Sequence, residues 1–450
     1  MNAEDPNLLS NPAFLLNEEM EFDELIEDVF FGDSSEEEAA PKRGGSKKGR
    51  APNKNRDFVG AYHKVVIMYF NGRQSTYDER DFERRFRCPR SVWNRIHDDF
   101  MGQDPFVHKK DATGRWGIYP LVKLVGCFRY IAYGDAFDRD DENLQIGEST
   151  LEQYCKQWSK MMVAQYGSEY LNRPPTERER RNISAAMAGK GFPGCLASWD
   201  CKHFVWKNCP MRLAGQMKGH AEGGKKTLIL ESISDHRRYL WHVNFGDAGS
   251  LNDINVLDKS DIVGALLHGD LSIVSNHYKI NGVERDWMYF LVDGIYPNWS
   301  IFMNPFSKSS DPDKTNYNTH QEAARKDIEC AFGILVSRFH VLKRELRSWY
   351  LEDIIDLLHA CVILHNMVVE ARAGDVSYST EEDAQLARQA NKTFPLFGHN
   401  QVSQQDAARE NMPFFAARVS TFNHRMTSGH EHARPKHDLV MHLKSKTTDD

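Results

Sequence analysis

The sequence has no Cys-x-x-Cys pair, no long apolar run and no basic stretch followed by apolar residues at its start. Its eight cysteines are scattered, which excludes a secreted disulfide framework and predicts reduced thiols in a cytosolic or nuclear protein. No apolar stretch has the length of a membrane span. We therefore expect no signal peptide, no membrane partner and an intracellular location.

The formal charge of −7 does not suggest nucleic-acid binding, but the charge is unevenly distributed. An acidic block from Glu18 to Glu38 precedes a basic block from Lys42 to Arg56. Because only local patches contact phosphates, the net charge is a poor guide to this function. The composition predicts a disordered segment over residues 1–56. Its basic part is either a solvated linker or a nuclear localisation signal or phosphate-contacting arm.

Residues 57–190 have apolar positions at helical spacing and are predicted to be mostly helical. Ser149 and Glu152 have the spacing of a capping box, which predicts a helix that begins at Ser149. Short helices in this arrangement form either a helix-turn-helix DNA-binding region or an ordinary helical bundle without DNA contact. The helical patterns cover 59–69, 91–100, 120–133 and 149–166.

The pattern changes at Gly191, where β-rich runs begin and later alternate with helical patterns. Residues 235–238 are predicted to form a hairpin turn, and residues beyond 372 are polar and weakly periodic. We therefore predict an α/β domain over 191–372 and a mostly flexible tail over 373–450. The predicted strands are 195–206, 227–234, 239–245 and 287–292, and the predicted helices are 252–267, 320–346 and 354–369.

Three acidic residues of this region occupy unusual positions. Asp200 lies inside an apolar strand, Asp293 ends another strand just before a glycine, and Glu329 lies beside the apolar stripe of a helix. An ionised carboxylate in a core strand is costly unless a cation pairs with it. Oxygen ligands suit Mg²⁺, and two metal ions about 3.5–4 Å apart assist phosphodiester chemistry. Two neighbouring strands and one helix could bring the three acids to one point.

Other interpretations of these residues are weaker. A single acid is usually ion-paired or exposed at the surface. This ordinary explanation is weaker for three acids that each occupy an unusual position. Paired carboxylates could serve glycoside hydrolysis, but this ignores the third acid. A zinc site formed by Cys195, Cys201, His203 and Cys209 would have a spacing that fits no common ligand pattern.

A series of motifs in fixed order resembles the PIF/Harbinger transposases, in the branch often called plant transposon proteins. The resemblance covers residues 121–369, and the motifs are specific together although each alone is weak. One departure is Trp199, where relatives usually carry a smaller residue. The motifs are FRYIAYG (128–134), IGEST (146–150), GFPGCLASWD (191–200), WKNCP (206–210), GSLNDINV (249–256), LVDGIYP (291–297), HQEAARKDIE (320–329), FGILVSRF (332–339) and LHNM (364–367).

The resemblance implies an α/β fold with an RNase H-like catalytic core, a mixed five-stranded sheet flanked by helices, and a helix-turn-helix-like N-terminal region. It implies that Asp200, Asp293 and Glu329 are the catalytic, metal-binding residues. Two Mg²⁺ ions, with Mn²⁺ as a substitute, would support cleavage at transposon ends and strand transfer to target DNA. It further implies a Myb-like DNA-binding partner that assists nuclear entry, and a homo-oligomer on DNA. The alternative is a host-adopted nuclear protein that binds DNA without cutting it.

Five further residues are possible auxiliaries. Asp253 begins a helical pattern, so it is expected to cap that helix, with a metal role as the alternative. Lys202 and His203 follow Asp200 and could contact phosphate or orient water, although a packed histidine is the more common outcome. Arg325 and Lys326 precede Glu329 and are either phosphate contacts or solvated charges.

Overall fold

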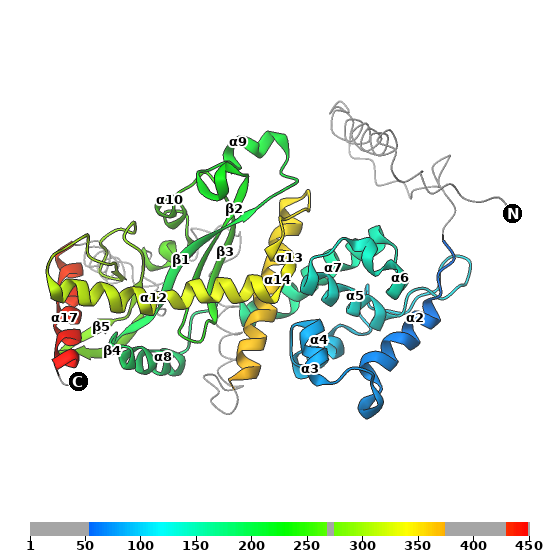
Figure 1. Cartoon of the computed structure of the whole chain (residues 1–450), viewed down its shortest axis with the longest axis horizontal. Coiled ribbons are helices and arrows are strands. Elements are labelled where there is room, and N and C mark those ends of the chain that lie inside the picture. The colour runs from blue at the N-terminus through cyan, green and yellow to red at the C-terminus, as the bar shows by residue number, and fades with distance from the viewer. Residues whose placement is uncertain (1–53, 268–273, 374–428, 449–450) are drawn as a thin grey trace, which may run out of the picture. The chain divides into compact units, whose positions relative to one another are not determined.

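A mixed five-stranded sheet organises residues 195–303 in the computed structural model, which describes residues 54–267, 274–373 and 429–448 (Figure 1). The strand order is β3-β2-β1-β6-β7. β1 with β2 and β2 with β3 are antiparallel, whereas β1 with β6 and β6 with β7 are parallel. This sheet agrees with the predicted one and is compatible with an RNase H-like core. The strands are β1 (Cys195–Val205), β2 (Thr227–Ser234), β3 (Leu240–Ala248), β6 (Tyr289–Leu291) and β7 (Phe302–Met303).

The predicted hairpin between β2 and β3 is confirmed, and Asp235 organises its turn. One carboxylate oxygen of Asp235 accepts hydrogen bonds from the backbone N–H of Arg237 (2.8 Å) and of Tyr239 (3.2 Å). The other accepts from the indole N–H of Trp241 at 3.1 Å. An aspartate that bonds to the backbone two residues on mimics a turn, so this buried carboxylate is satisfied by the hairpin that it shapes.

A second hairpin was not predicted. β4 (Ser275–Ile280) pairs antiparallel with β5 (Val283–Trp287) outside the main sheet. The predicted strand at 287–292 is therefore divided, since its first residue ends β5 and its centre forms β6. The predicted helix at 252–267 is also divided, into α10 (Asp253–Leu257) and α11 (Asp261–Leu267). Short elements of this kind carry too little periodicity for their boundaries to be predicted from sequence.

Residues 57–190, which were predicted to be mostly helical, consist mainly of helices. Its apolar faces bury large side chains such as Trp93, Phe128 and Trp158. The same buried cluster continues into the sheet through Phe192 and Trp199, so the core has no break near residue 190. The helix-turn-helix function stays a prediction. The helices are α2 (Phe58–Val65), α3 (Glu79–Phe86), α4 (Arg90–Phe100), α5 (Pro120–Tyr133), α6 (Asp141–Leu144), α7 (Glu148–Tyr170) and α8 (Glu177–Gly189).

The predicted capping box at Ser149 is wrong. The helix begins one residue earlier, at Glu148, with Gly147 at the N-cap and no side-chain cap. Ser149 is already helical, whereas an N-cap residue needs an extended backbone. A capping box occurs instead at Thr176, which opens α8 by exchanging hydrogen bonds with Glu179.

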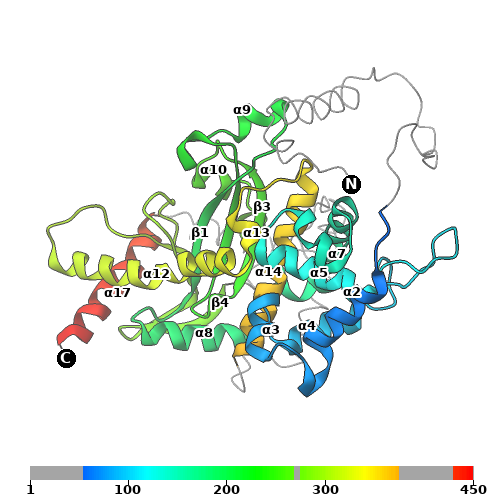
Figure 2. The ribbon, with the colours of Figure 1, turned by 45° about the vertical axis from the view of Figure 1, so that its right-hand side comes forward.

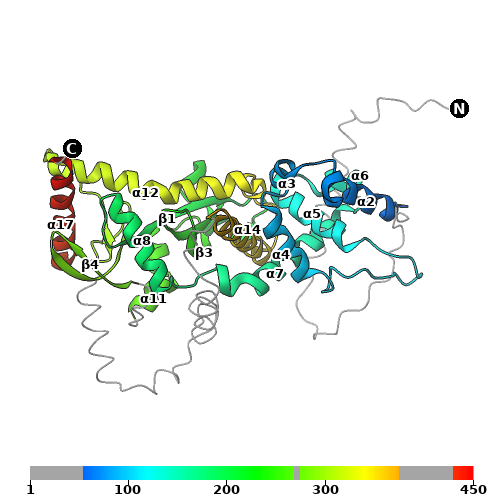
Figure 3. The same ribbon diagram turned by 90° about the horizontal axis from the view of Figure 1, so that it is seen from below.

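Long helices cover the sheet and connect it to the helical region. α12 (Pro312–Arg338) lies across β1, β2 and β6 along one side of the sheet (Figure 3). It begins earlier than predicted, with Asp311 as its N-cap, and it ends before the short α13 (His340–Lys343). α14 (Leu351–Arg372) packs against α7 and β3. The contacts of α12 with β1 and β6 place it beside the parallel strands.

By length and composition α14 could cross a membrane, contrary to the expectation that no apolar stretch is long enough. Most of its apolar 18-residue window is buried in the fold, including Leu358, Ile363 and Leu364. A helix that is apolar on most sides is typical of the core of a large protein as well as of a membrane span. The burial of α14 accounts for its apolar composition.

The prediction of a mostly flexible tail did not foresee the helix α17 (Gly429–Thr448). α17 packs against α12, β4 and β7 and buries Leu439, Val440 and Leu443. Its apolar positions are few and lie among histidines and lysines, so the sequence pattern is weak. Residues 374–428, and all but the last three residues of the predicted 1–56 segment, lie outside the described residues.

A buried asparagine connects three elements of the core. Asn366 on α14 accepts a hydrogen bond from the backbone N–H of Leu240 at 3.0 Å and donates to the Leu240 carbonyl at 2.9 Å. It also donates to the carbonyl of Tyr170 at the end of α7, at 3.0 Å. One side chain therefore satisfies buried backbone groups of both β3 and α7.

We predict that Asn366→Leu lowers the free energy of unfolding by about 2–5 kcal/mol, because it leaves three buried backbone groups without a partner. Denaturant unfolding monitored by circular dichroism measures this change. The control is Asn255→Leu, at an exposed position of α10. It is expected to change stability by less than about 0.5 kcal/mol. A loss below about 1 kcal/mol for Asn366→Leu would show that water or a local shift replaces these bonds.

Candidate active site

Parallel pairing of β1 with β6 brings Asp200 and Asp293 to neighbouring positions. Ser198 on β1 is opposite Leu291 on β6, and each aspartate lies two residues further along its own strand. Neighbouring strands are about 4.8 Å apart, and residues two apart point to the same side. The two aspartates therefore come to the same level of the sheet, although β6 itself ends at Leu291.

The backbone after β6 turns sharply and presents Asp293 to solvent. The Asp293 carboxylate accepts a hydrogen bond from the backbone N–H of Ile295 at 2.6 Å. Asn304 donates to the carbonyl oxygens of Asp293 (3.4 Å) and Tyr296 (2.6 Å) and holds the turn from its other side. Gly294 and Ile295 are exposed, so this side chain lies at an open edge, as the strand-end glycine predicted.

Three residues spaced by four on α12 form the wall of the site. Gln321 donates to the carbonyls of Val292 (2.7 Å) and Met303 (2.9 Å), which fixes the helix to the ends of β6 and β7. One turn further, Arg325 donates to the Asp200 carboxylate at 3.2 Å. One turn beyond that, Glu329 pairs with Arg325 at 2.9 Å. Side chains four apart share a helix face, so one docking contact sets the positions of the next two residues.

Arg325 therefore lies between two of the three predicted triad residues. Its guanidinium and the Asp200 side chain are both largely buried, whereas about half of the Glu329 side chain is exposed. Arg325 was predicted to contact phosphate or to be solvated, and its observed partners are the carboxylates themselves. This ion pair could not be predicted from the sequence, because it depends on the distance between α12 and β1.

Burial raises the pKa of Asp200 to about 6, with smaller contributions from the nearby carboxylates of Asp253 and Asp293. The backbone N–H of Cys201 and the Arg325 guanidinium act in the opposite direction. The pKa of Asp253 is also raised, by burial first and then by the charge of Asp293. Like charges held together disfavour ionisation, so Asp200, Asp253 and Asp293 form one electrostatic cluster.

Asp253 was expected to cap the helix that follows it, and this is wrong. Asn252 is the N-cap of α10, since its side chain accepts a hydrogen bond from the backbone N–H of Asn255 at 2.9 Å. Asp253 is the first residue inside the helix, half-buried beside Cys201 and His203. Its side chain therefore belongs to the acidic cluster.

The other auxiliary residues have more ordinary surroundings. His203 shares a hydrogen bond of 2.9 Å with the hydroxyl of Thr227, and burial lowers its pKa, so it is neutral at pH 7. Lys326 is exposed and lies 3.8 Å from Glu322 on its own helix. Lys202 is half-buried, with its ammonium 5.9 Å from the Phe204 ring. Among the described residues, none of these three forms a hydrogen bond or ion pair with the predicted triad.

Trp199 points to the opposite face of β1 from Asp200, because successive strand residues alternate between faces. Its ring packs edge-on against Phe290 and Phe302, and its N–H donates to the buried carboxylate of Glu231 at 3.0 Å. The residue that departs from the family pattern is therefore a satisfied core residue. Glu231 was not identified from the sequence, since its burial depends on the pairing of β1 with β2.

No group of three or more histidines, cysteines or acids in the described ranges is arranged to hold a metal ion. The zinc alternative therefore has no support, and Cys195 is buried with its thiol directed to the carbonyl of Ala197. For the acids, the reason is visible in the ion pairs, since Arg325 occupies the space between Asp200 and Glu329. Arg325 bridges Asp200 and Glu329, and Asp293 interacts electrostatically with Asp200.

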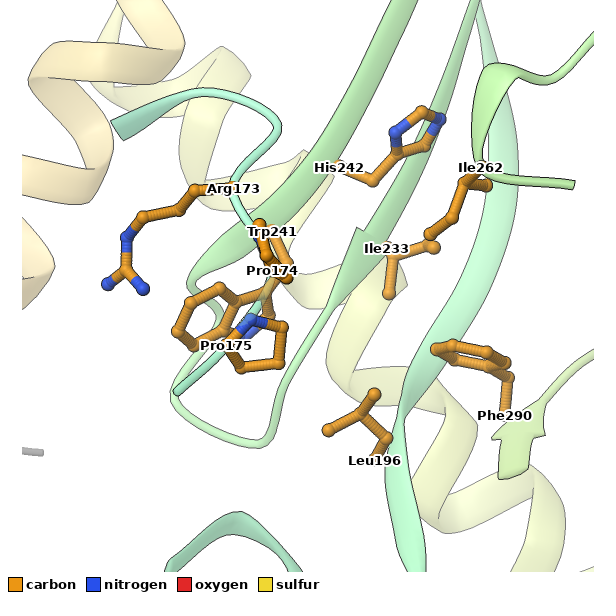
Figure 4. A pocket seen from close by; sticks show the side chains of 9 residues that line it. All are labelled: Arg173, Pro174, Pro175, Leu196, Ile233, Trp241, His242, Ile262 and Phe290. Atoms are coloured by element: carbon orange, nitrogen blue, oxygen red, sulfur yellow. The ribbon is translucent and has the colours of Figure 1, made fainter. Parts of the chain in front are cut away.

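A cavity on another part of the sheet offers no alternative active site (Figure 4). Its volume is about 20 Å³, enough for about one water molecule. Its lining is mostly apolar, including Leu196, Ile233 and Phe290, and it contains none of the predicted site residues. The acidic cluster remains the strongest candidate site.

One comparison with known proteins gave a match. Residues 168–376 match the model of a family described as "Plant transposon protein". The match supports a transposon-related family. The matched residues include the acidic cluster, Arg325 and Glu329. Comparisons with curated proteins and with solved structures gave no match.

We predict that Asp200→Asn stabilises the fold at neutral pH in a chelator. The folded protein holds the Asp200 proton up to about pH 6, whereas the unfolded chain releases it near pH 3.8. Ionised Asp200 therefore destabilises the fold above about pH 6, and this penalty disappears as the pH falls below about 4. A shift of about two pKa units corresponds to at most about 3 kcal/mol, reduced by the weaker bond to Arg325.

Unfolding of Asp200→Asn and wild type in urea at several pH values measures this difference. Asp258→Asn, at an exposed position, is the control and should match wild type at every pH. The burial account is contradicted if Asp200→Asn is less stable than wild type at pH 7.5, or if the difference does not change between pH 4 and pH 7.5.

Proposed function

We propose that this chain is a metal-dependent DNA endonuclease and transposase of the PIF/Harbinger kind. The observation that carries the proposal is the register of parallel β1 and β6, which brings Asp200 level with Asp293 just beyond β6, together with Arg325 of α12, which pairs with both Asp200 and Glu329. The match to plant transposon proteins supports the same class of activity. In this proposal Asp200, Asp293 and Glu329 are the catalytic, metal-binding residues.

The chemistry of the site suits a hard divalent cation. Asp200, Asp253 and Asp293 are partly buried carboxylates, and burial first, then the neighbouring negative charges, raises the pKa values of Asp200 and Asp253. Oxygen ligands are preferred by Mg²⁺, and Mn²⁺ accepts the same ligands. Two such ions, when bound, would activate the attacking oxygen and stabilise the leaving oxygen of a phosphodiester. Asp200 and Asp293 would hold the ions, with Glu329 completing the set.

Arg325 has a defined part in this proposal. It pairs with both Asp200 and Glu329 and offsets their negative charges. It must release Asp200 before that carboxylate can act as a metal ligand. The freed guanidinium would then lie beside the site, where it could bind a DNA phosphate. Gln321 would keep α12 in place during this exchange, since its bonds go to the strand ends.

The reaction we propose has two displacements at phosphorus. Water first hydrolyses a phosphodiester at the transposon end, and the released 3′-hydroxyl then attacks target DNA. The role of the chain is to hold the carboxylates and the DNA backbone in line, so no covalent enzyme intermediate is involved. Asp200 is fixed by its strand and Asp293 by its turn, which gives the two acids a constant separation.

The connection between β1 and β2 offers a surface for DNA. Lys207, Arg212 and Lys218 are exposed there and make no ion pair within the described part of the chain. Figure 2 shows this connection, which contains α9 (Ala214–Met217), extending beyond the end of the sheet. β1 carries Asp200 and, near its end, His203. The three cations lie in the segment of chain that follows this strand. Phosphate contacts from such residues position DNA without reading its sequence.

The wider setting belongs to the same proposal. DNA binding by the helical region, a Myb-like partner protein, a homo-oligomer on DNA and a nuclear location are what the family resemblance implies for this chain. The second candidate function is a host-adopted nuclear protein that binds DNA without cutting it. The ion pairs of Arg325 favour that alternative, because they neutralise two of the three acids.

We predict that wild-type protein nicks plasmid DNA or terminal-repeat DNA in Mg²⁺ or Mn²⁺, and that Asp200→Asn, Asp293→Asn and Glu329→Gln each lower the rate by about a thousandfold. This is about 4 kcal/mol of transition-state stabilisation, a reasonable loss for one metal ligand. Single-turnover cleavage on gels measures it.

Two matched controls accompany these variants. Asp258→Asn lies on the exposed surface, and Glu322→Gln lies on α12 two turns before Glu329, so both should cleave at the wild-type rate. If wild type binds DNA but never cleaves it in either metal, the non-cutting alternative is correct. If the three site variants cleave as fast as the controls, the assignment of these acids is wrong.

A further inference from the structure

A cavity in the helical region is lined by three cations that share only one carboxylate partner among the described residues. Its volume is about 180 Å³, and it lies among α2, α3, α5 and α6. Lys64, Arg85 and Arg129 line it together with Asn143. None of the residues of the acidic cluster takes part, since those lie on β1, α10, α12 and the turn after β6. The cavity therefore needs its own explanation.

Arg85 is the most unusual of these cations. Its Nε is buried and has no hydrogen-bond partner, and its guanidinium lies 3.8 Å from the centre of the Tyr77 ring. Arg85 makes no ion pair with any acid in the described ranges. Its neighbour Arg84 points outward and pairs with Asp81 at 2.8 Å. A buried guanidinium donor without an acceptor costs free energy, which an anionic ligand would recover.

The other two cations do not remove this excess of positive charge. Arg129 donates through Nε to Asp140 at 3.0 Å, and its other guanidinium N–H groups do not take part in this bond. Lys64 donates to the neutral side chain of Asn143 at 2.9 Å. Three cations therefore have one carboxylate partner among the described residues, and the donors outnumber the acceptors. Arg85 and Arg129 also oppose the effect of burial on the pKa of Tyr69, so both lie near that ring.

We propose that this cavity binds a phosphoryl group, supplied by a DNA strand or by a free nucleotide or phosphate ion. A phosphoryl group carries several acceptor oxygens and pairs strongly with the fork of an arginine. The cavity is smaller than the 300 Å³ or more typical of sites for whole drug-sized ligands, so it suits one small charged group. The proposal goes beyond the catalytic one and uses none of its residues.

The cavity would bind phosphate and not read a base. The Tyr77 ring has Arg85 on it, and the Tyr69 ring stacks at 5.2 Å between ring centres. Both rings are thus engaged with neighbours and offer no free face on which a base could stack. Binding at this cavity would therefore be independent of DNA sequence and would depend on salt.

The test measures binding with a chelator present, so that it does not depend on cleavage. Thermal unfolding is followed with inorganic phosphate, with dAMP and with a short DNA duplex, each at constant ionic strength adjusted with chloride. We expect a concentration-dependent rise in Tm for wild type that is lost in Arg85→Gln and retained in Arg84→Gln. Arg84 is the matched control, because it lies on the same helix with its partner outside the cavity.

DNA affinity from fluorescence anisotropy separates the sources of the phosphoryl group. If DNA is the source, Arg85→Gln weakens duplex binding about tenfold and lowers the slope of log affinity against log salt by about one. If the source is a small ligand, phosphate or dAMP raises the Tm and Arg85→Gln leaves duplex binding unchanged. Lys64→Gln repeats the measurement should Arg85→Gln fail to fold.

Two results would overturn the phosphoryl site. One is a wild-type protein whose Tm responds to phosphate, dAMP and duplex no more than to chloride. The other is a response that Arg85→Gln, or Lys64→Gln in its place, shares equally with Arg84→Gln. A response to polyglutamate but to none of the three phosphate ligands would assign the cavity to an acidic peptide instead. Because cleavage is absent from these assays, their failure leaves the catalytic proposal untouched.

Discussion

The parallel pairing of β1 with β6 is the constraint on which the site depends. It sets the register in which Ser198 faces Leu291, and this register carries Asp200 and Asp293 to the same level of the sheet. A shift of one residue would turn one of the two carboxylates to the other face. The neighbouring antiparallel pair of β1 with β2 fixes the same strand from its other edge, so the position of Asp200 is determined twice.

Helix α12 lies against the strand ends and forms one side of the candidate site. Gln321 is almost fully buried and binds two strand-end carbonyls, which leaves the helix little freedom to slide. Arg325 and Glu329 follow on the same face, and their ion pairs balance the negative charge that the sheet gathers. Arg325 thus offsets the charges of Asp200 and Glu329 from within the fold, a role that divalent ions would take in the proposed enzyme.

The sequence predicted a residue's position best where its neighbours in the chain determine that position. Asp200 was placed in an apolar strand, and it lies within β1, whereas Asp293 was placed at a strand end and lies two residues beyond β6. The role of Arg325 could not be predicted, because it depends on the distance between a helix and a strand that are far apart in the chain. The capping of α10 by Asn252 differs from the prediction by a single residue, which is the usual precision of helix boundaries. α17 was missed because its apolar face is narrow.

Anomalous diffraction from crystals of the full chain grown with Mn²⁺ tests the central claim most directly, since it locates the cation itself. The account predicts an anomalous peak between the carboxylates of Asp200 and Asp293, with Arg325 withdrawn from Asp200. Crystals in which Mn²⁺ binds only elsewhere, while Arg325 still bonds Asp200 and Glu329, would contradict it.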